Sequence, residues 1–113
     1  MHEMSLAESV VQIAEDTARQ NGGSRISSVF LEVGRLAGVE IEALRFCFDA
    51  ASRSSLAEGA ELVIERPDGQ AWCMPCGETV SLSSLADPCP RCGSHQLQVT
   101  GGNELKVREI AIH

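Results

Sequence analysis

Four of the five cysteines form two closely spaced pairs, the pattern in this sequence with the clearest chemical meaning. Both pairs have the form C-x-x-C, at residues 73–76 and 89–92, and twelve residues separate them. Two intervening residues let both thiolates of one turn face a single ion, and zinc takes four such ligands in a tetrahedron. The spacing therefore predicts a structural zinc site made by Cys73, Cys76, Cys89 and Cys92.

A redox dithiol is the alternative chemistry for a C-x-x-C pair. It requires a pair that follows a strand and opens a helix, where the thiol pKa is depressed. Neither pair opens a recognisable helical pattern, and one redox pair would leave the other unexplained. Because four thiolates close the coordination of zinc, the predicted site is structural and not catalytic.

The amino terminus, Met1-His2-Glu3, could bind a second kind of metal ion. Initiator methionine is normally removed only before a small residue, so His2 should keep Met1 in place. The Met1 amine, the His2 backbone nitrogen and the His2 imidazole could close two adjacent chelate rings, with the Glu3 amide as a fourth nitrogen. Square-planar nitrogen donors select Ni(II) or Cu(II) rather than zinc. The alternative is a frayed, exposed terminus without a ligand, which is the commoner situation at a chain end.

Other residues with chemical potential have simpler interpretations. His95 follows the second cysteine pair and could supply an extra ligand, although a solvated loop position is expected. Cys47 lies between two phenylalanines in a helical pattern and is expected to be a small buried hydrophobe. The sequence has no Ser/His/Asp arrangement, no carboxylate pair and no G-x-x-x-x-G-K-[ST] loop, so we expect a protein that is not an enzyme.

Composition and charge exclude several classes of protein. The 113 residues include 9 basic and 16 acidic side chains, and a net charge of −7 argues against a broad nucleic-acid footprint. No uncharged apolar stretch reaches the roughly 18–20 residues that a transmembrane helix needs. Glu3 and Glu8 stand where a signal peptide would carry basic residues, and five cysteines do not make a disulfide framework. We therefore expect a small cytoplasmic protein that binds no membrane.

Periodic patterns outside the cysteine block predict two helices and three strands. The first helix is expected to begin with the capping box Ser5-Leu6-Ala7-Glu8 and to end at residues 21–23. Its apolar positions are Leu6, Val10, Ile13 or Ala14, and Thr17. Alternating apolar residues predict strands over 28–33, 59–65 and 105–112, the last with a β-bulge near residues 108–109, and helical spacing returns over 40–52.

The order of these elements predicts an α+β fold with a small sheet of about three strands and two helices. The block between residues 69 and 103 is too poor in large apolar residues to fold without a metal, so it is expected to be an inserted zinc ribbon held by the four cysteines. The last strand should rejoin the first sheet, giving one domain of residues 1–68 with 104–113. Trp72, the one aromatic residue of the block, should pack at its junction with that sheet.

Several of these stretches together resemble the HypA/HybF family of hydrogenase nickel-maturation proteins. They are the initial Met-His-Glu, residues 29–34 (VFLEVG), Val39-Glu40, residues 44–49 (LRFCFD), residues 57–60 (AEGA) and the two C-x-x-C pairs. The resemblance spans essentially the whole chain in the expected order.

The resemblance implies a metallochaperone that carries two metals. It implies structural zinc on Cys73, Cys76, Cys89 and Cys92, and nickel on His2 with the Met1 amine and the Glu3 backbone. It also implies a GTPase partner from nickel maturation and delivery of nickel to the large subunit of [NiFe] hydrogenase. Some members of the family serve urease as well. A zinc-ribbon interaction module without a nickel role is the alternative, and whether the chain is a monomer or a strand-exchanged dimer stays open.

Overall fold

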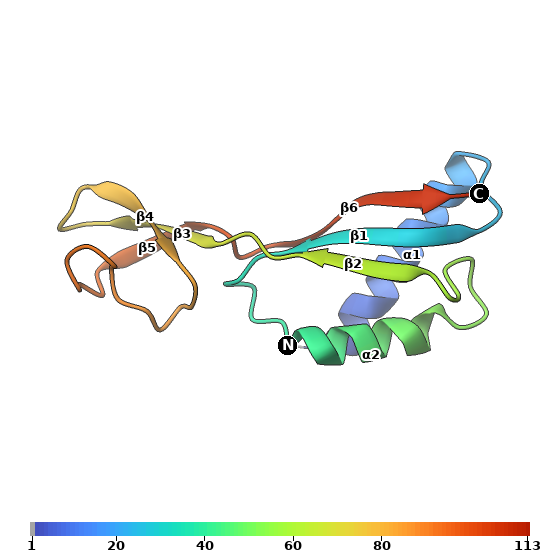
Figure 1. Cartoon of the computed structure of the whole chain (residues 1–113), viewed down its shortest axis with the longest axis horizontal. Coiled ribbons are helices and arrows are strands. Elements are labelled where there is room, and N and C mark those ends of the chain that lie inside the picture. Colours follow the sequence, from blue (N-terminus) through green and yellow to red (C-terminus); the bar gives the residue numbers. More distant parts are fainter. Residues whose placement is uncertain (1) are drawn as a thin grey trace. The chain divides into compact units, whose positions relative to one another are not determined.

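Figure 1 shows the computed structural model of the chain, which describes residues 2–113. The elements are α1 (Glu3–Gln20), β1 (Ile26–Val33), α2 (Ile41–Ser52), β2 (Glu61–Glu65), β3 (Gly69–Cys73), β4 (Glu78–Leu82), β5 (Leu97–Gly101) and β6 (Leu105–Ile112). The described residues thus confirm the expected α+β class, with two helices, two three-stranded sheets and a cluster of four cysteines.

The chain divides into two compact units, which we describe separately. The first unit contains the chain up to Leu31, Val39–Ile64 and Lys106–His113. The second contains Glu32–Gly38 and Glu65–Leu105. The loop that follows β1 therefore belongs to the same unit as the four cysteines.

The first sheet has the strand order β2-β1-β6, so the last strand does rejoin it. β6 runs antiparallel to β1, because Gly34 N donates to Glu104 O at one end and His113 N donates to Arg25 O at the other, both at 2.9 Å. β2 runs parallel to β1. Ile26 N donates to Leu56 O before β2 begins, and Arg66 Nε donates to Val33 O after β2 ends. The α2 crossover between β1 and β2 makes this parallel pairing possible.

Helix α1 begins three residues earlier than the capping box predicted. His2 is the N-cap residue and has no side-chain cap, whereas Ser5 and Glu8 are exposed residues inside the helix, so the predicted box is wrong. Glu3 explains the earlier start, because its carboxylate accepts the backbone N–H of Glu40 at 3.2 Å. A negative charge in the first turn is also favourable to the helix dipole.

The buried face of α1 is made of small residues. The fully or nearly fully buried residues are Ala7, Val10, Val11, Ala14 and Ala18. Val10 and Ala14 are buried, as predicted. Ile13 is 49% exposed, because the helix face that packs against the core is centred on the alanines rather than on Ile13. On α2, Leu44 and Phe48 are buried, and in β1, Val29, Leu31 and Val33 are buried.

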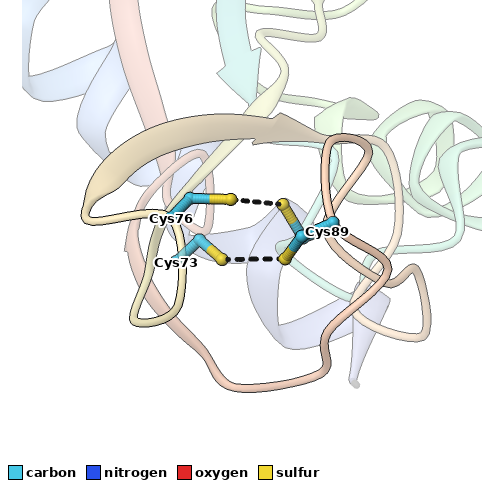
Figure 2. A group of neighbouring side chains, drawn as sticks. Cys73, Cys76 and Cys89 are labelled. Carbon is cyan, nitrogen blue, oxygen red and sulfur yellow. Dashed lines mark hydrogen bonds between the residues drawn. The ribbon is translucent and has the colours of Figure 1, made fainter.

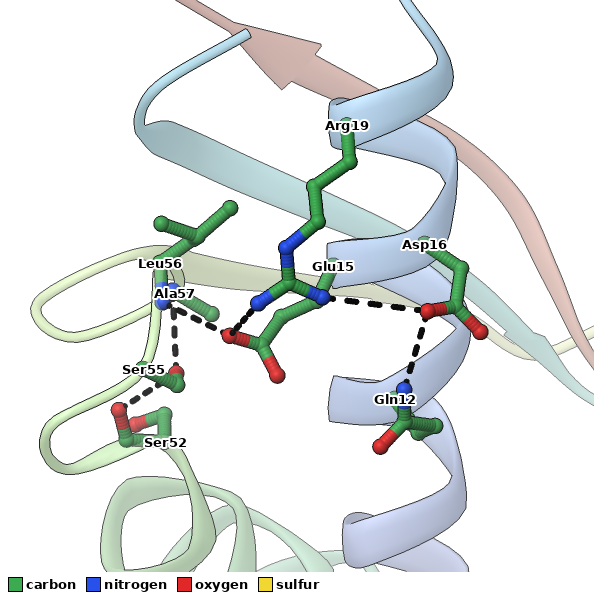
Figure 3. A network of polar contacts seen from close by, with 8 residues as sticks. All are labelled: Gln12, Glu15, Asp16, Arg19, Ser52, Ser55, Leu56 and Ala57. Carbon is green, nitrogen blue, oxygen red and sulfur yellow. Dashed lines mark hydrogen bonds and ion pairs between the residues drawn. The ribbon is translucent and has the colours of Figure 1, made fainter.

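Helices α1 and α2 run side by side in the same direction. Glu3 contacts Glu40 just before α2, and the Glu15 carboxylate accepts the N–H of Leu56 at 3.1 Å just after it. Figure 3 shows this second contact, in which Glu15 also pairs with Arg19 at 3.3 Å. The two glutamates therefore tie both ends of α2 to α1.

The second unit is built on an antiparallel sheet with the order β4-β3-β5. One face forms a small core in which Ala71 and Leu82 pack with Leu36 from the loop after β1. Trp72 points to the other face and is 42% exposed, and its packing at a junction stays a prediction. Strand alternation places it there, since its neighbours Ala71 and Cys73 occupy the buried face.

Three glycines bring the connections of the second unit into close contact. Leu36 N donates to Gly102 O at 2.8 Å, which ties the loop after β1 to the turn before β6. A Cβ atom on Gly34 would collide with the Gly102 carbonyl, and a Cβ atom on Gly102 would collide with the backbone of Gly69. Gly102 also has a φ of +77°, a conformation that other residues adopt with strain. The loop after β1 and the turn before β6 can therefore cross this closely only with glycine at residues 34 and 102.

Candidate metal centre

The four paired cysteines converge from two loops of the second unit. Cys73 ends β3 and Cys76 lies in the turn before β4, while Cys89 and Cys92 lie in the loop before β5. Their sulfur atoms all lie within 4.8 Å of one another. Two sulfur contacts, Cys73–Cys92 at 3.6 Å and Cys76–Cys89 at 3.9 Å, each join one C-x-x-C pair to the other, and dashed lines mark them in Figure 2.

Each C-x-x-C pair is shaped by a tight turn that closes on a glycine. Gly77 N donates to Cys73 O at 2.8 Å, and Gly93 N donates to Cys89 O at 2.9 Å. Both glycines have positive φ angles, 65° and 76°, which only glycine adopts without strain. In the second turn, Arg91 N also donates to the Cys89 sulfur at 3.4 Å. The two turns thus present their cysteines in equivalent ways.

The four sulfurs differ in their surroundings. Cys73 and Cys89 are buried, and they pack with Val80. Cys76 is half-buried and Cys92 is exposed. An ion pair between Arg91 and Glu78 links the second turn to β4 beside the cluster. One side of the site is therefore sealed by the core, and the other faces solvent.

Hydrogen bonds and burial set the protonation of the thiols when no cation is bound. Burial raises the pKa of Cys73, and the thiol contact with Cys92 raises the pKa of Cys76 to about 12. The backbone N–H of Cys92, followed by that of Arg91, lowers the pKa of Cys89 to about 7 despite burial. A cation must therefore displace protons from the cluster to bind all four sulfurs as thiolates.

The donor set and its dimensions fit a tetrahedral metal ion. Zinc–sulfur bonds of about 2.3 Å imply sulfur–sulfur separations of about 3.8 Å in a tetrahedron. The separations of the Cys73–Cys92 and Cys76–Cys89 sulfurs, 3.6 and 3.9 Å, lie on either side of this value. His95 is exposed and is not part of the cluster, and no other group of metal-ligating side chains occurs within residues 2–113. The second unit therefore contains a four-cysteine metal site.

The amino-terminal residues lie in the first unit, and Met1 falls outside the described part of the chain. His2 is exposed, and its carbonyl accepts the N–H of Leu6 at 3.1 Å, the first hydrogen bond of α1. The Glu3 carboxylate accepts the Glu40 N–H, and this hydrogen bond lowers the pKa of Glu3. Because the first amides of a helix have no partner within it, the N–H of Glu3 is not used by the helix ladder.

Sequence patterns missed the placement of Glu40 beside Glu3. Glu40 is exposed, as are Glu42 and Asp49 of the same helix. Glu40 is the N-cap residue of α2, and its backbone N–H donates to the Glu3 carboxylate at the start of α1. No local pattern joins two residues 37 positions apart. Cys47 differs from expectation in a smaller way, since it is half-buried rather than buried.

Neither helix in the described part of the chain is long and apolar enough to span a bilayer.

Comparison with known proteins identifies a family that matches nearly the whole chain. Residues 1–112 match the family model described as "Hydrogenase/urease nickel incorporation, metallochaperone, hypA".

Similar proteins share both the length and the fold of this chain. Proteins named "Hydrogenase maturation factor HypA" from Dechloromonas aromatica (strain RCB) and Albidiferax ferrireducens are 55% and 53% identical to it, each over 99% of both chains. The solution structure of the Ni metallochaperone HypA from Helicobacter pylori has a TM-score of 0.71, at 23% identity over 99% of this chain and 97% of that one. That structure supports the fold, and the family follows from the closer sequence matches. The chain belongs to the HypA family of hydrogenase and urease nickel-incorporation metallochaperones.

Proposed function

We propose that this protein carries Ni(II) at its amino terminus and delivers it to the large subunit of [NiFe] hydrogenase during maturation. Family membership supports the role in nickel incorporation. The observation that carries the proposed nickel site is the position of His2, which is exposed at the N-cap of α1. The backbone N–H groups next to it, in the first turn of the helix, have no carbonyl acceptor within the helix. The protein acts as a carrier and not as an enzyme.

The proposed nickel ligands are nitrogen atoms of the first three residues. The Met1 amine, the His2 backbone nitrogen and imidazole, and the Glu3 amide can form a square plane, which Ni(II) favours. The hydrogen bond from Glu40 to the Glu3 carboxylate supports this arrangement, because it fixes the first turn of α1 close to the chain end. An exposed site with few ligands also allows nickel to leave, as delivery requires.

Zinc is the proposed occupant of the four-cysteine site. Soft thiolates in a tetrahedron suit zinc, whereas nitrogen donors in a plane suit nickel, so ligand type would sort the two ions. Zinc there is structural, because four protein ligands leave no open position. Reduced thiols also favour the cytoplasm as the place of action, since that compartment keeps cysteines free for metals.

The proposed partners are a nickel-maturation GTPase and the hydrogenase large subunit, with urease maturation proteins as further candidates. The test is the nickel content of the large subunit, measured by mass spectrometry after purification from cells that lack this protein. Cells given the wild-type chain or the control His113→Ala should yield nickel-loaded subunit. Cells given His2→Ala should yield subunit without nickel at limiting nickel supply. Equal loading in all three would contradict the proposal.

A further inference from the structure

The four cysteines of the metal site differ in their access to solvent. Cys92 is exposed, whereas Cys73 and Cys89 are buried and Cys76 is half-buried. Metal binding keeps each of these sulfurs as a thiolate, and the thiolate is the form of cysteine that reacts with peroxides. A small oxidant in solution therefore meets the site first at Cys92.

A second sulfur lies within reach of Cys92. The Cys73 sulfur, at the end of β3, is 3.6 Å from it (Figure 2). A disulfide bond is about 2.0 Å long, so the two sulfurs need to approach by only about 1.6 Å. Cys89, in the same turn as Cys92, is engaged elsewhere, because its sulfur accepts the N–H of Arg91 at 3.4 Å and contacts Cys76 at 3.9 Å. These contacts favour a bond between the two turns over a bond within one of them.

We propose that Cys92 and Cys73 form a peroxide-sensitive switch, in which oxidation joins them in a disulfide and withdraws two of the four thiolates from zinc. This inference rests on the proposed function for zinc alone, and not for nickel or for any partner. Two remaining thiolates do not complete a tetrahedron, so the site no longer retains the ion. A dithiol reductant and fresh zinc restore the site, because a disulfide is reversible, unlike a sulfonic acid.

The reaction consumes one hydrogen peroxide and two thiolates. The Cys92 thiolate attacks one peroxide oxygen, so that an S–O bond forms, the O–O bond breaks, and the departing hydroxide takes a proton to become water. The Cys73 thiolate then attacks the sulfur of the Cys92 sulfenic acid. An S–S bond forms, the S–O bond breaks, and a second hydroxide takes a proton and leaves as water. The two sulfurs together lose two electrons, and the peroxide gains the same two.

Loss of the metal changes the second unit, because the ligands are part of its core. Cys73 and Cys89 pack with Val80 in one of its two small apolar clusters, so this cluster loosens when its sulfurs no longer share an ion. The new disulfide retains one link between the end of β3 and the loop before β5. The oxidised chain therefore keeps the two turns together and can be reduced and reloaded.

The first test treats the zinc-loaded full chain with one equivalent of hydrogen peroxide in the absence of air. A chromophoric zinc indicator measures release of the ion, and mass spectrometry after alkylation of the remaining thiols maps disulfides. Trypsin cleaves after Arg91 and so separates Cys92 from the other three ligands. We expect zinc release in proportion to a disulfide between Cys73 and Cys92. A first disulfide from Cys92 to Cys76 or Cys89, or zinc retained in excess peroxide, would overturn the switch.

Cysteine variants test whether the exposed sulfur is the one that reacts. Zinc-loaded Cys92→Ser should release zinc about tenfold more slowly than the wild type at equal peroxide, because a hydroxyl is not oxidised in this way. Cys47→Ser is the matched control, because Cys47 is a half-buried cysteine of the first unit, and its release rate should stay within about twofold of the wild type. Release from Cys92→Ser at the wild-type rate would contradict the proposal.

A labelling experiment on the wild type gives the same answer without a ligand variant, which covers the case in which Cys92→Ser fails to hold zinc. Zinc-loaded protein is treated with a limiting amount of N-ethylmaleimide, and the modified cysteines are identified by mass spectrometry. Among the four ligands, Cys92 should be labelled first, because its side chain is exposed. Earlier labelling of Cys73 or Cys89 would overturn the assignment of Cys92 as the reactive sulfur.

Discussion

The Glu3 carboxylate connects the amino terminus to the start of α2. It accepts the Glu40 N–H at 3.2 Å, and this hydrogen bond lowers its pKa from an ordinary value of 4.5. A carboxyl with a lower pKa in the folded state stabilises the fold at pH values above 4.5. That contribution is lost as the pH falls through the lowered pKa. The start of α1 should therefore loosen in acid.

Replacing Glu3 tests this contact at the scale of one residue. We expect Glu3→Gln to have a lower melting temperature than the wild type at pH 7, because glutamine is a weaker, uncharged acceptor. The difference should shrink as the pH is lowered past 4.5, since the wild type then loses its charge as well. Thermal unfolding from about pH 3 to pH 8 measures it. Glu8→Gln, at an exposed position of the same helix, is the control, and an identical pH profile for both variants would argue against the contact.

Residue patterns predicted the metal cluster well because the signal is local. A C-x-x-C turn specifies its own geometry, and the two turns close on Gly77 and Gly93 as expected of such turns. The contact between Glu3 and Glu40 could not be predicted, because it depends on the packing of two helices. The exposure of Trp72 was not predicted either, and it follows from strand alternation in β3.

At the scale of elements, the loop after β1 is shaped by backbone crossings. A side chain on Gly34 would collide with the backbone of Gly102, and a side chain on Gly102 would collide with the backbone of Gly69 and Asp68. Leu36, two residues further, packs with Ala71 and Leu82 in the core of the second unit. The spacing of apolar residues predicted β1 and α2 correctly. The loop between them has no such repeating pattern, so the packing of Leu36 could not be predicted.

Adding a methyl group at Gly34 tests the crossing. We expect Gly34→Ala to destabilise the protein by about 1–3 kcal/mol, because the backbone of residue 102 must move to admit the Cβ atom. Urea unfolding followed by circular dichroism measures the change. Gly101→Ala is the matched control, since its Cβ atom would meet only Gln70 Cβ at 3.9 Å. Equal stability of the two variants would be incompatible with the crossing described here.

At the scale of the whole molecule, the two units differ in what stabilises them. The first unit has two helices that cover apolar strand residues such as Val29 and Leu31. The second has a much smaller core, and a four-cysteine site lies within it. Structural zinc in small domains contributes about 10–16 kcal/mol at neutral pH, more than so small a core supplies.

Removal of zinc should therefore unfold the second unit and spare the first. After chelation at neutral pH, we expect amide protons of β3, β4 and β5 to exchange rapidly while those of α1 and α2 remain protected. Acid should act in the same direction, because protons compete with zinc for thiolates such as Cys73, whose pKa is raised. Hydrogen exchange measured by NMR gives both results, and Trp72, the only tryptophan, gives an independent fluorescence signal. Persistent protection of β3–β5 without zinc would contradict this account.

The order of the elements outside the cysteine block and the return of the last strand could be predicted, because alternating apolar residues mark each of those strands. Arg108 and Glu109 are both exposed and interrupt that alternation in β6, where the β-bulge stays a prediction. The three strands inside the block could not be predicted in the same way, since their register depends on pairing across turns that the cysteines shape.

Nickel binding at the amino terminus is the central claim, and one calorimetric titration tests it most directly. Zinc-loaded protein with a native Met1 terminus is titrated with Ni(II) beside His2→Ala and the control His113→Ala. We predict one tight nickel site in the wild type and in His113→Ala, and its loss in His2→Ala with zinc retained. Equal nickel binding by all three proteins would contradict the claim.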